Sequence, residues 1–332
     1  MILAGDIGGT KAVLAVFEVA ADGALTSVRE TVYHCADYPS LEAVLDVFLP
    51  AAGAHGLSGA CFGVAGPVVG GVVHTTNLPW TIDAAVVSAK LGVPVALIND
   101  LQATALGTLV LPASAFAVLQ TGVAAPPGAT IAVIAPGTGL GESLLVSDGG
   151  HYRALPAEAG HADFAPGTDE QIELLRYLRG VHGPHVSYER VLSGAGLGDL
   201  YDFVRAASGV AEPAWLTAEF TGHDRNAQIS RVALDGRDPV CVRALDLFVE
   251  ILGAEAGNMA LRGLAAGGVV IGGGIPPKIL PALKKPGFLE RLTGKGRFSV
   301  WARNLPVRVA LEPRAALFGA AHHAASHKDA RS

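Results

Sequence analysis

The feature that most constrains the fold of this chain is a sequence pattern that occurs twice. The segments "AGDIGGTKAVLAV" (4–16) and "IAPGTGLGESLLV" (134–146) each place an apolar run, a turn rich in glycine and threonine, and a second apolar run in succession. Short apolar runs bounded by glycine are typical of buried strands, so each segment predicts a β-hairpin. Two such hairpins, each opening a strand-rich half, indicate two similarly folded lobes that face each other across a cleft.

Strand-like and helix-like runs alternate along the whole chain, which is the pattern of an α/β protein. Helices are predicted at 40–52, 83–91, 101–109, 169–179, 187–192, 239–263 and 313–325. We expect a small α/β lobe over residues 1–110, joined by the C-terminal helix at about 313–325, and a large α/β lobe over 111–312. The length of 332 residues is sufficient for two such domains.

Composition and charge exclude several classes of protein. The net charge of −6 argues against a nucleic-acid surface, which needs a basic patch. The sequence has no run of 18 uninterrupted apolar residues, so a membrane span is not expected. The chain begins with a strand-like run that contains Asp6 where a signal peptide would be basic. Three distant cysteines, Cys35, Cys61 and Cys241, suit a reducing compartment. We expect a cytoplasmic protein.

The two glycine-rich turns are candidates for phosphate binding, because backbone N–H groups can approach an anion where no Cβ intervenes. A P-loop is excluded, since Thr10 precedes Lys11 and a strand follows, and the Rossmann spacing of glycines is absent. A plain β-hairpin is the alternative for either turn. Two turns together, with the Thr10 and Thr138 hydroxyls and with Asp6 placed to hold Mg²⁺ through water, favour phosphate.

A third glycine cluster, Gly272 to Gly274, ends an apolar strand. It predicts either a turn before the Pro276–Pro277 pair or a flat backbone platform beneath an adenine ring. The sequence leaves both interpretations open.

Asn99 and Asp100 follow the apolar run 93–98, which is typical of a strand covered on both faces. In α/β sheets, ligands bind at the carboxyl ends of strands, so these side chains are candidates for contact with a substrate. The alternative is that the pair caps the helix that follows.

A further set of polar residues matches the chemistry of a sugar. Glu158 and His161 are three residues apart, so in a helical turn both side chains point the same way. Taken singly, these two, Glu189 and Asn77 would more often be core, solvent-facing or turn residues. Together with Asn99 and Asp100 they supply groups that accept or bridge the hydrogen bonds of vicinal hydroxyls. A divalent metal site is the rival use.

The order of these motifs identifies a resemblance. The chain carries, in succession, "DIGGT" from Asp6, "NLPW" from Asn77, "ND" at 99–100, "GTGLG" at 137–141, "EAGH" at 158–161, Glu189 and "GGG" at 272–274. In this order it resembles the bacterial glucokinases of the sugar kinase/actin/chaperone-ATPase superfamily, over about residues 3–325. The resemblance implies two actin-like (ribonuclease-H-like) lobes and ATP- and Mg²⁺-dependent phosphorylation of glucose to glucose 6-phosphate.

The resemblance also implies roles for individual residues. Nucleotide binding falls to Gly5, Asp6, Ile7, Gly8, Gly9, Thr10, Gly137, Thr138, Gly139, Gly272, Gly273 and Gly274. Substrate binding falls to Asn77, Asn99, Asp100, Gly137, Glu158, His161 and Glu189. Asp100 is the implied catalytic base, and no residue is implied as a direct metal ligand.

Two comparisons with the family refine these expectations. Lys11 stands where this branch more often has asparagine, which concerns contacts to phosphate rather than the fold. No cysteine lies between Cys61 and Cys241, so we expect no structural zinc of the kind found in the related repressor/open-reading-frame/kinase group. For want of room before Met1, we also expect none of the DNA-binding helices of that group's repressors.

The expected partners are glucose, ATP and a second copy of the chain in a homodimer, with no nucleic acid and no membrane. The alternatives are a kinase for another hexose (mannose, fructose or N-acetylglucosamine) and a sugar-binding sensor of the same fold that has lost turnover.

Overall fold

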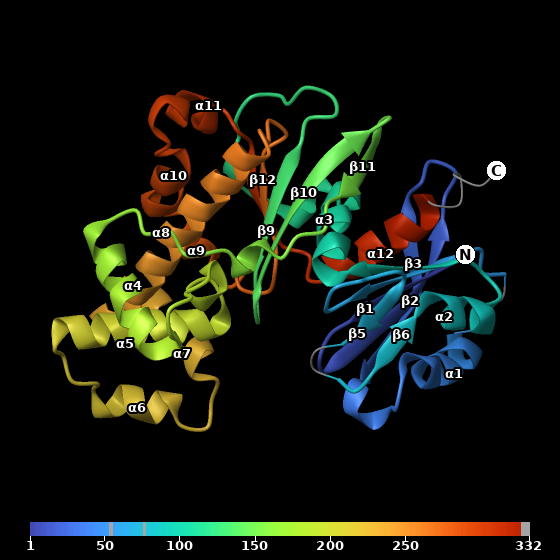
Figure 1. Ribbon diagram of the computed structural model, residues 1–332, viewed down its shortest axis with the longest axis horizontal. Coiled ribbons are helices and arrows are strands. Elements are labelled where there is room, and N and C mark those ends of the chain that lie inside the picture. The colour runs from blue at the N-terminus through green and yellow to red at the C-terminus, as the bar shows by residue number, and fades with distance from the viewer. Residues whose placement is uncertain (53–55, 76–77, 327–332) are drawn as a thin grey trace. The chain divides into compact units, whose positions relative to one another are not determined.

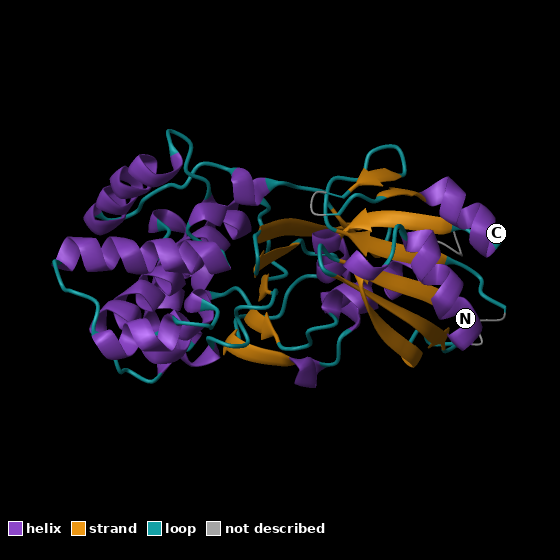
Figure 2. Ribbon diagram, turned by 90° about the horizontal axis from the view of Figure 1, so that it is seen from below, coloured by secondary structure: helices purple, strands orange, loops and turns teal. Residues whose placement is uncertain are grey.

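The structure of the protein is a computed structural model that describes residues 1–52, 56–75 and 78–326. The chain forms two compact units, each of which contains a β-sheet and helices (Figures 1 and 2). The first unit comprises Met1–Ala115, His151–Pro156 and Glu312–Ser332, and the second comprises Phe116–Gly150 and Ala157–Leu311. The predicted α/β class is confirmed.

The sheet of the first unit brings the ends of three parallel strands to one edge. Its order is β3 (Leu25–His34), β2 (Lys11–Val19), β1 (Ile2–Ile7), β4 (Ala60–Val64) and β7 (Val95–Asn99). β1 and β2 are antiparallel and form the first predicted hairpin, whereas β1, β4 and β7 are parallel to one another. The residues that follow β1 and β7 therefore emerge on the same side of the sheet.

Four helices cover this sheet. They are α1 (Leu41–Ala52), α2 (Ala84–Leu91), α3 (Asp100–Val110) and α12 (Ala315–Ser326). α12 lies on one side of the sheet and α1 on the other (Figure 1). Glycine allows α3 and α12 to approach closely, because a Cβ at Gly319 would lie 1.7 Å from the carbonyl oxygen of Ala103. This packing fixes α3, and with it Asp100, against the sheet.

Three short strands complete the first unit. β5 (Val72–His74) and β6 (Thr81–Asp83) form a two-stranded sheet. β11 (His151–Ala154) lies against α3, where the side-chain amide of Gln102 donates to the carbonyl of Ala154 at 2.9 Å.

The sheet of the second unit is centred on β9. Its strands lie in the order β10 (Leu140–Asp148), β9 (Ile131–Pro136), β12 (Val269–Ile271), β13 (Val307–Ala310) and β8 (Phe116–Gln120). β9 and β10 are antiparallel, which confirms the second predicted hairpin, and β12 is parallel to β9. The long helix α8 (Pro239–Arg262) packs on this sheet and contributes many residues to the core of the unit.

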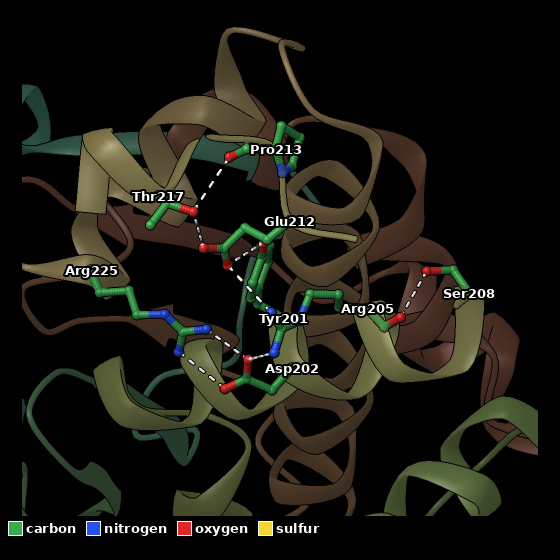
Figure 3. Close-up of polar contacts among 8 residues, drawn as sticks. All are labelled: Tyr201, Asp202, Arg205, Ser208, Glu212, Pro213, Thr217 and Arg225. Atoms are coloured by element: carbon green, nitrogen blue, oxygen red, sulfur yellow. Dashed lines mark hydrogen bonds and ion pairs between the residues drawn. The ribbon is translucent and has the colours of Figure 1, made fainter. Parts of the chain in front are cut away.

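Further helices surround α8. They are α4 (Asp169–His182), α5 (Gly194–Ser208), α6 (Ala214–Phe220), α7 (Arg225–Leu234), α9 (Leu280–Leu283), α10 (Pro286–Thr293) and α11 (Ser299–Arg303). Polar contacts tie α5 to its neighbours (Figure 3). The Arg225 guanidinium donates to both oxygens of Asp202, at 3.0 and 2.7 Å, and Glu212 accepts from the hydroxyls of Tyr201 and Thr217 at 3.0 and 2.8 Å.

One local expectation was wrong. The run 187–192 is not a helix but a single 3₁₀ turn, Tyr188–Arg190, because the chain turns there before α5 begins at Gly194. β7 is an edge strand in which Val95 and Ala96 are partly exposed, whereas Leu97 and Ile98, which face opposite sides of the sheet, are both buried. Within the described parts of the chain, no helix is both long and apolar enough to cross a membrane.

Candidate functional site

Cys35 anchors the first glycine turn, which lies between β1 and β2, by two hydrogen bonds. The backbone N–H of Gly8 donates to the carbonyl of Lys11 at 2.9 Å and closes the turn. Cys35 is buried; its N–H donates to the carbonyl of Thr10 at 3.0 Å and its thiol to that of Gly8 at 3.6 Å. Gly8 and Gly9 remain partly exposed and Thr10 is exposed. The turn is thus anchored on one side and open to a ligand on the other.

Asp6, at the end of β1, lies near Asp100 at the start of α3. Gly63 on β4 pairs with Asp6 on one side and with Ile98 of β7 on the other. A Cβ at Gly63 would lie 2.8 Å from that of Ala103 and 3.7 Å from the Cα of Asp100, so the glycine allows α3 to begin directly over β4. Burial and the charge of Asp100 raise the pKa of Asp6 to about 6.

Asn99 is the N-cap of α3, so the capping interpretation is confirmed for this residue. Its Oδ1 accepts from the N–H of Leu101 at 2.9 Å, and its Nδ2 donates to the carbonyl of Gly66 at 3.2 Å. An amide oxygen can accept a second hydrogen bond and an amide nitrogen can donate a second. Capping and contact with a ligand are therefore compatible at Asn99.

The second glycine turn, between β9 and β10, lies at the beginning of α5. The N–H of Gly137 donates to the carbonyl of Gly139 at 2.8 Å, and the N–H of Gly194 donates to the carbonyl of Gly137 at 2.9 Å. Ser193 caps the helix by accepting from the N–H of Gly196 at 3.1 Å. The positive end of a 15-residue helix thus adjoins the turn, which favours an anion there.

The third glycine cluster follows β12 and lies beside the strand that leads into this second turn. The N–H of Gly272 donates to the carbonyl of Ile134 at 2.8 Å. Gly273 has a φ of +84°, and a Cβ there would lie 2.4 Å from the carbonyl oxygen of Pro136. Both the left-handed backbone and the close approach require glycine.

Three polar side chains gather at the start of β10. The N–H of Leu140 donates to Oε2 of Glu189 at 3.1 Å. Glu158 and His161 flank a 3₁₀ turn, as their spacing predicts, with 4.0 Å between the carboxylate and the imidazole. Between them, Gly160 packs on Leu140, since a Cβ there would lie 2.1 Å from the Leu140 carbonyl oxygen.

The predicted residues thus fall into two groups, one in each unit. The first unit holds the predicted nucleotide residues Gly5 to Thr10, with Asn99 and Asp100. The second holds Gly137, Thr138, Gly139, Glu158, His161, Glu189 and Gly272 to Gly274. Asn77 lies outside the described residues.

Sequence reasoning missed several residues that position these groups. Leu140 acts through its backbone, which no side-chain pattern could reveal. Cys35 lies far along the chain from the turn that it supports, and Gly63 lies far from the start of α3, for which it leaves room. Glu142 had a visible signal, because a glutamate within the apolar run "ESLLVS" is unusual for a buried strand.

Glu142 is a buried acid at the third position of β10, the strand that follows the second turn. The residue is 1% exposed, and neither carboxylate oxygen has a hydrogen-bond partner among the residues that the structure describes. On α8, the fully buried Glu255 forms an ion pair with Arg262 at 2.5 Å. Burial, and then the charge of Glu255, raise the pKa of Glu142 to about 8, against an opposing effect of Arg262.

Comparison with known proteins gives one consistent result. The family model described as Glucokinase matches residues 3–327. A curated glucokinase of Nostoc punctiforme is 39% identical, over 97% of this chain and 98% of its own length. The crystal structure of a glucokinase from an Antarctic psychrotroph is 34% identical, with a TM-score of 0.87 and 98% of each chain covered.

A more distant structure shares the fold. It is that of a ROK family glucokinase from Streptomyces griseus in complex with glucose and AMPPNP, 23% identical, with a TM-score of 0.66, covering 98% of this chain and 99% of its own. The expected two-lobed sugar-kinase fold is confirmed by these likenesses.

Proposed function

The chain belongs to the glucokinase family, and from this premise we propose that it transfers the γ-phosphoryl group of ATP to the 6-hydroxyl of glucose. The observation that carries the proposal is the contact between Leu140 and Glu189, at 3.1 Å. Within the second unit, this contact places the glycine turn that is suited to phosphate beside the Glu189 carboxylate, which is suited to a sugar hydroxyl. A phosphoryl donor and its acceptor must be held side by side in this way.

Asp100 is the proposed general base. It accepts the proton of the sugar hydroxyl as the new O–P bond forms, while the bond between the γ-phosphorus and the β,γ-bridging oxygen breaks and ADP leaves. α3 begins at Asp100, whose Oδ1 accepts the N–H of Leu101 at 2.9 Å, so the carboxylate is oriented before substrate binds. The second oxygen is the one proposed to face the hydroxyl.

The remaining roles follow from donor and acceptor chemistry. Asn99, Glu158, His161 and Glu189 offer acceptors and donors to the vicinal hydroxyls of a hexose. The turns at Gly8–Thr10 and Gly137–Gly139 offer backbone N–H groups to the phosphates, where preorganised dipoles stabilise the charge that develops in the transition state. Gly272 to Gly274 form the proposed platform for the adenine.

Asp6 fits a role in holding Mg²⁺. Burial, and then the charge of Asp100, raise the pKa of Asp6 to about 6, so two carboxyl groups that repel each other lie at this edge of the sheet. A divalent cation offsets such repulsion, and Mg²⁺ commonly keeps several waters and binds through one or two carboxylates and the substrate phosphates. When bound, Mg²⁺ neutralises charge on the transferred phosphoryl group.

A sugar panel tests the proposal. ADP release is followed by a coupled assay with ATP, Mg²⁺ and, in turn, glucose, mannose, fructose and N-acetylglucosamine. We expect kcat/KM for glucose to exceed that for each other sugar. A preference for another hexose would change the substrate but keep the chemistry, whereas sugar binding without turnover would identify a sensor. The homodimer belongs to the same proposal and is tested by sedimentation.

A further inference from the structure

We propose that Gly139, expected only to contact the nucleotide, is a positioning residue for the sugar side of the site. It leaves the space in which the carboxylate of Glu189 lies. The inference rests on the proposed function, because it takes Glu189 as a ligand of the sugar. Gly139 thereby becomes a determinant of sugar affinity that acts through another side chain.

The first observation is the lack of room at Gly139. A Cβ at this position would lie 2.5 Å from Oε2 of Glu189 and 3.3 Å from its carboxyl carbon. The same Oε2 accepts the N–H of Leu140 at 3.1 Å. Any side chain at Gly139 therefore displaces the oxygen that the next backbone N–H holds.

The second observation is that space, and not backbone conformation, requires glycine here. Gly139 does not have the positive φ that marks, for example, Gly273 at +84°. Alanine at 139 is consequently compatible with the backbone of the turn. Its effect should fall on Glu189 and not on the hairpin.

The third observation is that the backbone carrying Glu189 is anchored and does not move away easily. The preceding residue, Tyr188, is 1% exposed, and its N–H donates to the carbonyl of Ala162 at 3.0 Å. Its ring packs edge-on against Phe164, with 5.7 Å between the ring centroids. A Cβ at Gly139 is therefore accommodated by rotation of the Glu189 side chain, which breaks the contact with Leu140.

The experiment measures Gly139→Ala by calorimetric glucose titration without nucleotide, by KM for glucose and for ATP, and by thermal melting. Gly180→Ala, on α4, is the control, because a Cβ there would meet none of the described residues within 4 Å and Gly180 is not among the residues of the proposed site. We expect the glucose Kd of Gly139→Ala to rise about tenfold, equivalent to about 1.4 kcal/mol, while KM for ATP changes little.

A double-mutant cycle tests whether the effect passes through Glu189. Glu189→Gln should weaken glucose binding less in the Gly139→Ala background than in the wild type, since the contact is already broken there. Additive effects, or a rise in KM for ATP with an unchanged glucose Kd, would overturn the proposal.

A shorter acid provides the rescue. In Gly139→Ala/Glu189→Asp the carboxylate withdraws from the added methyl group, so we expect this variant to melt at or above the temperature of Gly139→Ala. If Gly139→Ala does not fold, folding of the double variant supports the proposal and failure of both overturns it. Failure of the proposed function is distinct, because the wild type would then bind no glucose. If the sugar panel selects another hexose, the titrations are made with that sugar.

Discussion

Asp6 lies close to Asp100 at one edge of the first sheet, where burial, and then the charge of Asp100, raise the pKa of Asp6 to about 6. Gly63 makes this arrangement possible, because any side chain on that residue of β4 would collide with Ala103 of α3. The proposed function gives the two acids different tasks at one place, proton acceptance for Asp100 and cation binding for Asp6.

Asp100→Asn should abolish turnover and leave glucose binding nearly intact. The amide keeps the size of the side chain but cannot accept the proton, and a general base typically contributes about 10²–10⁴-fold to the rate. The measurements are kcat in the coupled assay and glucose Kd by calorimetry. Asp46→Asn is the control, since Asp46 lies on the exposed side of α1 and pairs only with Lys90 among the contacts described. A variant that keeps more than about a tenth of wild-type kcat would show that Asp100 is not the base.

Asp6→Asn should raise the Mg²⁺ concentration needed for half-maximal rate and leave the glucose Kd unchanged. A lost contact to a charged group costs about 1.5–3 kcal/mol, which corresponds to roughly 10- to 150-fold in affinity. Titration of the rate with Mg²⁺ at fixed ATP measures the change. Asp22→Asn, in an exposed turn, serves as the control. An unaltered Mg²⁺ titration would remove Asp6 from the proposed cation site.

The two hairpins and their turns were predictable because their signals are local. An apolar run, two or three glycines and a second apolar run specify strand, turn and strand from neighbouring residues alone. The same holds for α8, whose start is marked by Asp238 as N-cap and Pro239 at its first position.

The contact between Leu140 and Glu189 was not predictable, since it joins residues 49 positions apart through a backbone N–H. α5 was missed for a different reason. Its first turns, "GAGLG", have low helix propensity, yet packing requires these glycines. A Cβ at Gly196 would lie 2.7 Å from the backbone of Val191, and one at Gly198 would lie 2.4 Å from Oδ1 of Asn226. Tertiary contacts outweighed local preference.

Glu158→Gln and His161→Ala should raise KM for glucose strongly and KM for ATP little. In the proposed site each change removes one hydrogen bond to the sugar, so we expect a loss of about 10- to 150-fold in kcat/KM. Both side chains are more than half exposed, so we expect little change in melting temperature. The control is Glu173→Gln, which also removes an exposed acid three residues from its partner, here Arg176.

Other outcomes for this pair would be equally clear. A structural role would lower the melting temperature and spare the kinetics of the folded fraction. A metal site would make a chelator mimic the variants even with Mg²⁺ in excess. Stable variants with an unaltered glucose KM would remove both residues from the sugar site.

The last prediction concerns the pH dependence of stability, which Glu142 should make visible. Its pKa in the folded protein is raised from an ordinary value of 4.5 to about 8, first by burial and then by Glu255. Between these values the folded state binds the proton more tightly than the unfolded state. The contribution of Glu142 to stability is therefore complete below pH 4.5 and is lost as the pH rises towards 8, at up to about 1.4 kcal/mol per pH unit.

Glu142→Gln removes this dependence, because the amide stays neutral at every pH. We expect the melting temperature of the variant to rise relative to that of the wild type as the pH increases from 5 to 8, the window set by the two pKa values. Calorimetry across this range measures the difference. As the control, Glu173→Gln replaces an exposed acid on α4, and its melting temperature should change with pH as that of the wild type does. If the melting temperature of Glu142→Gln also changes with pH as that of the wild type does, then Glu142 is ionised in the folded protein and Arg262 outweighs the effects of burial and Glu255.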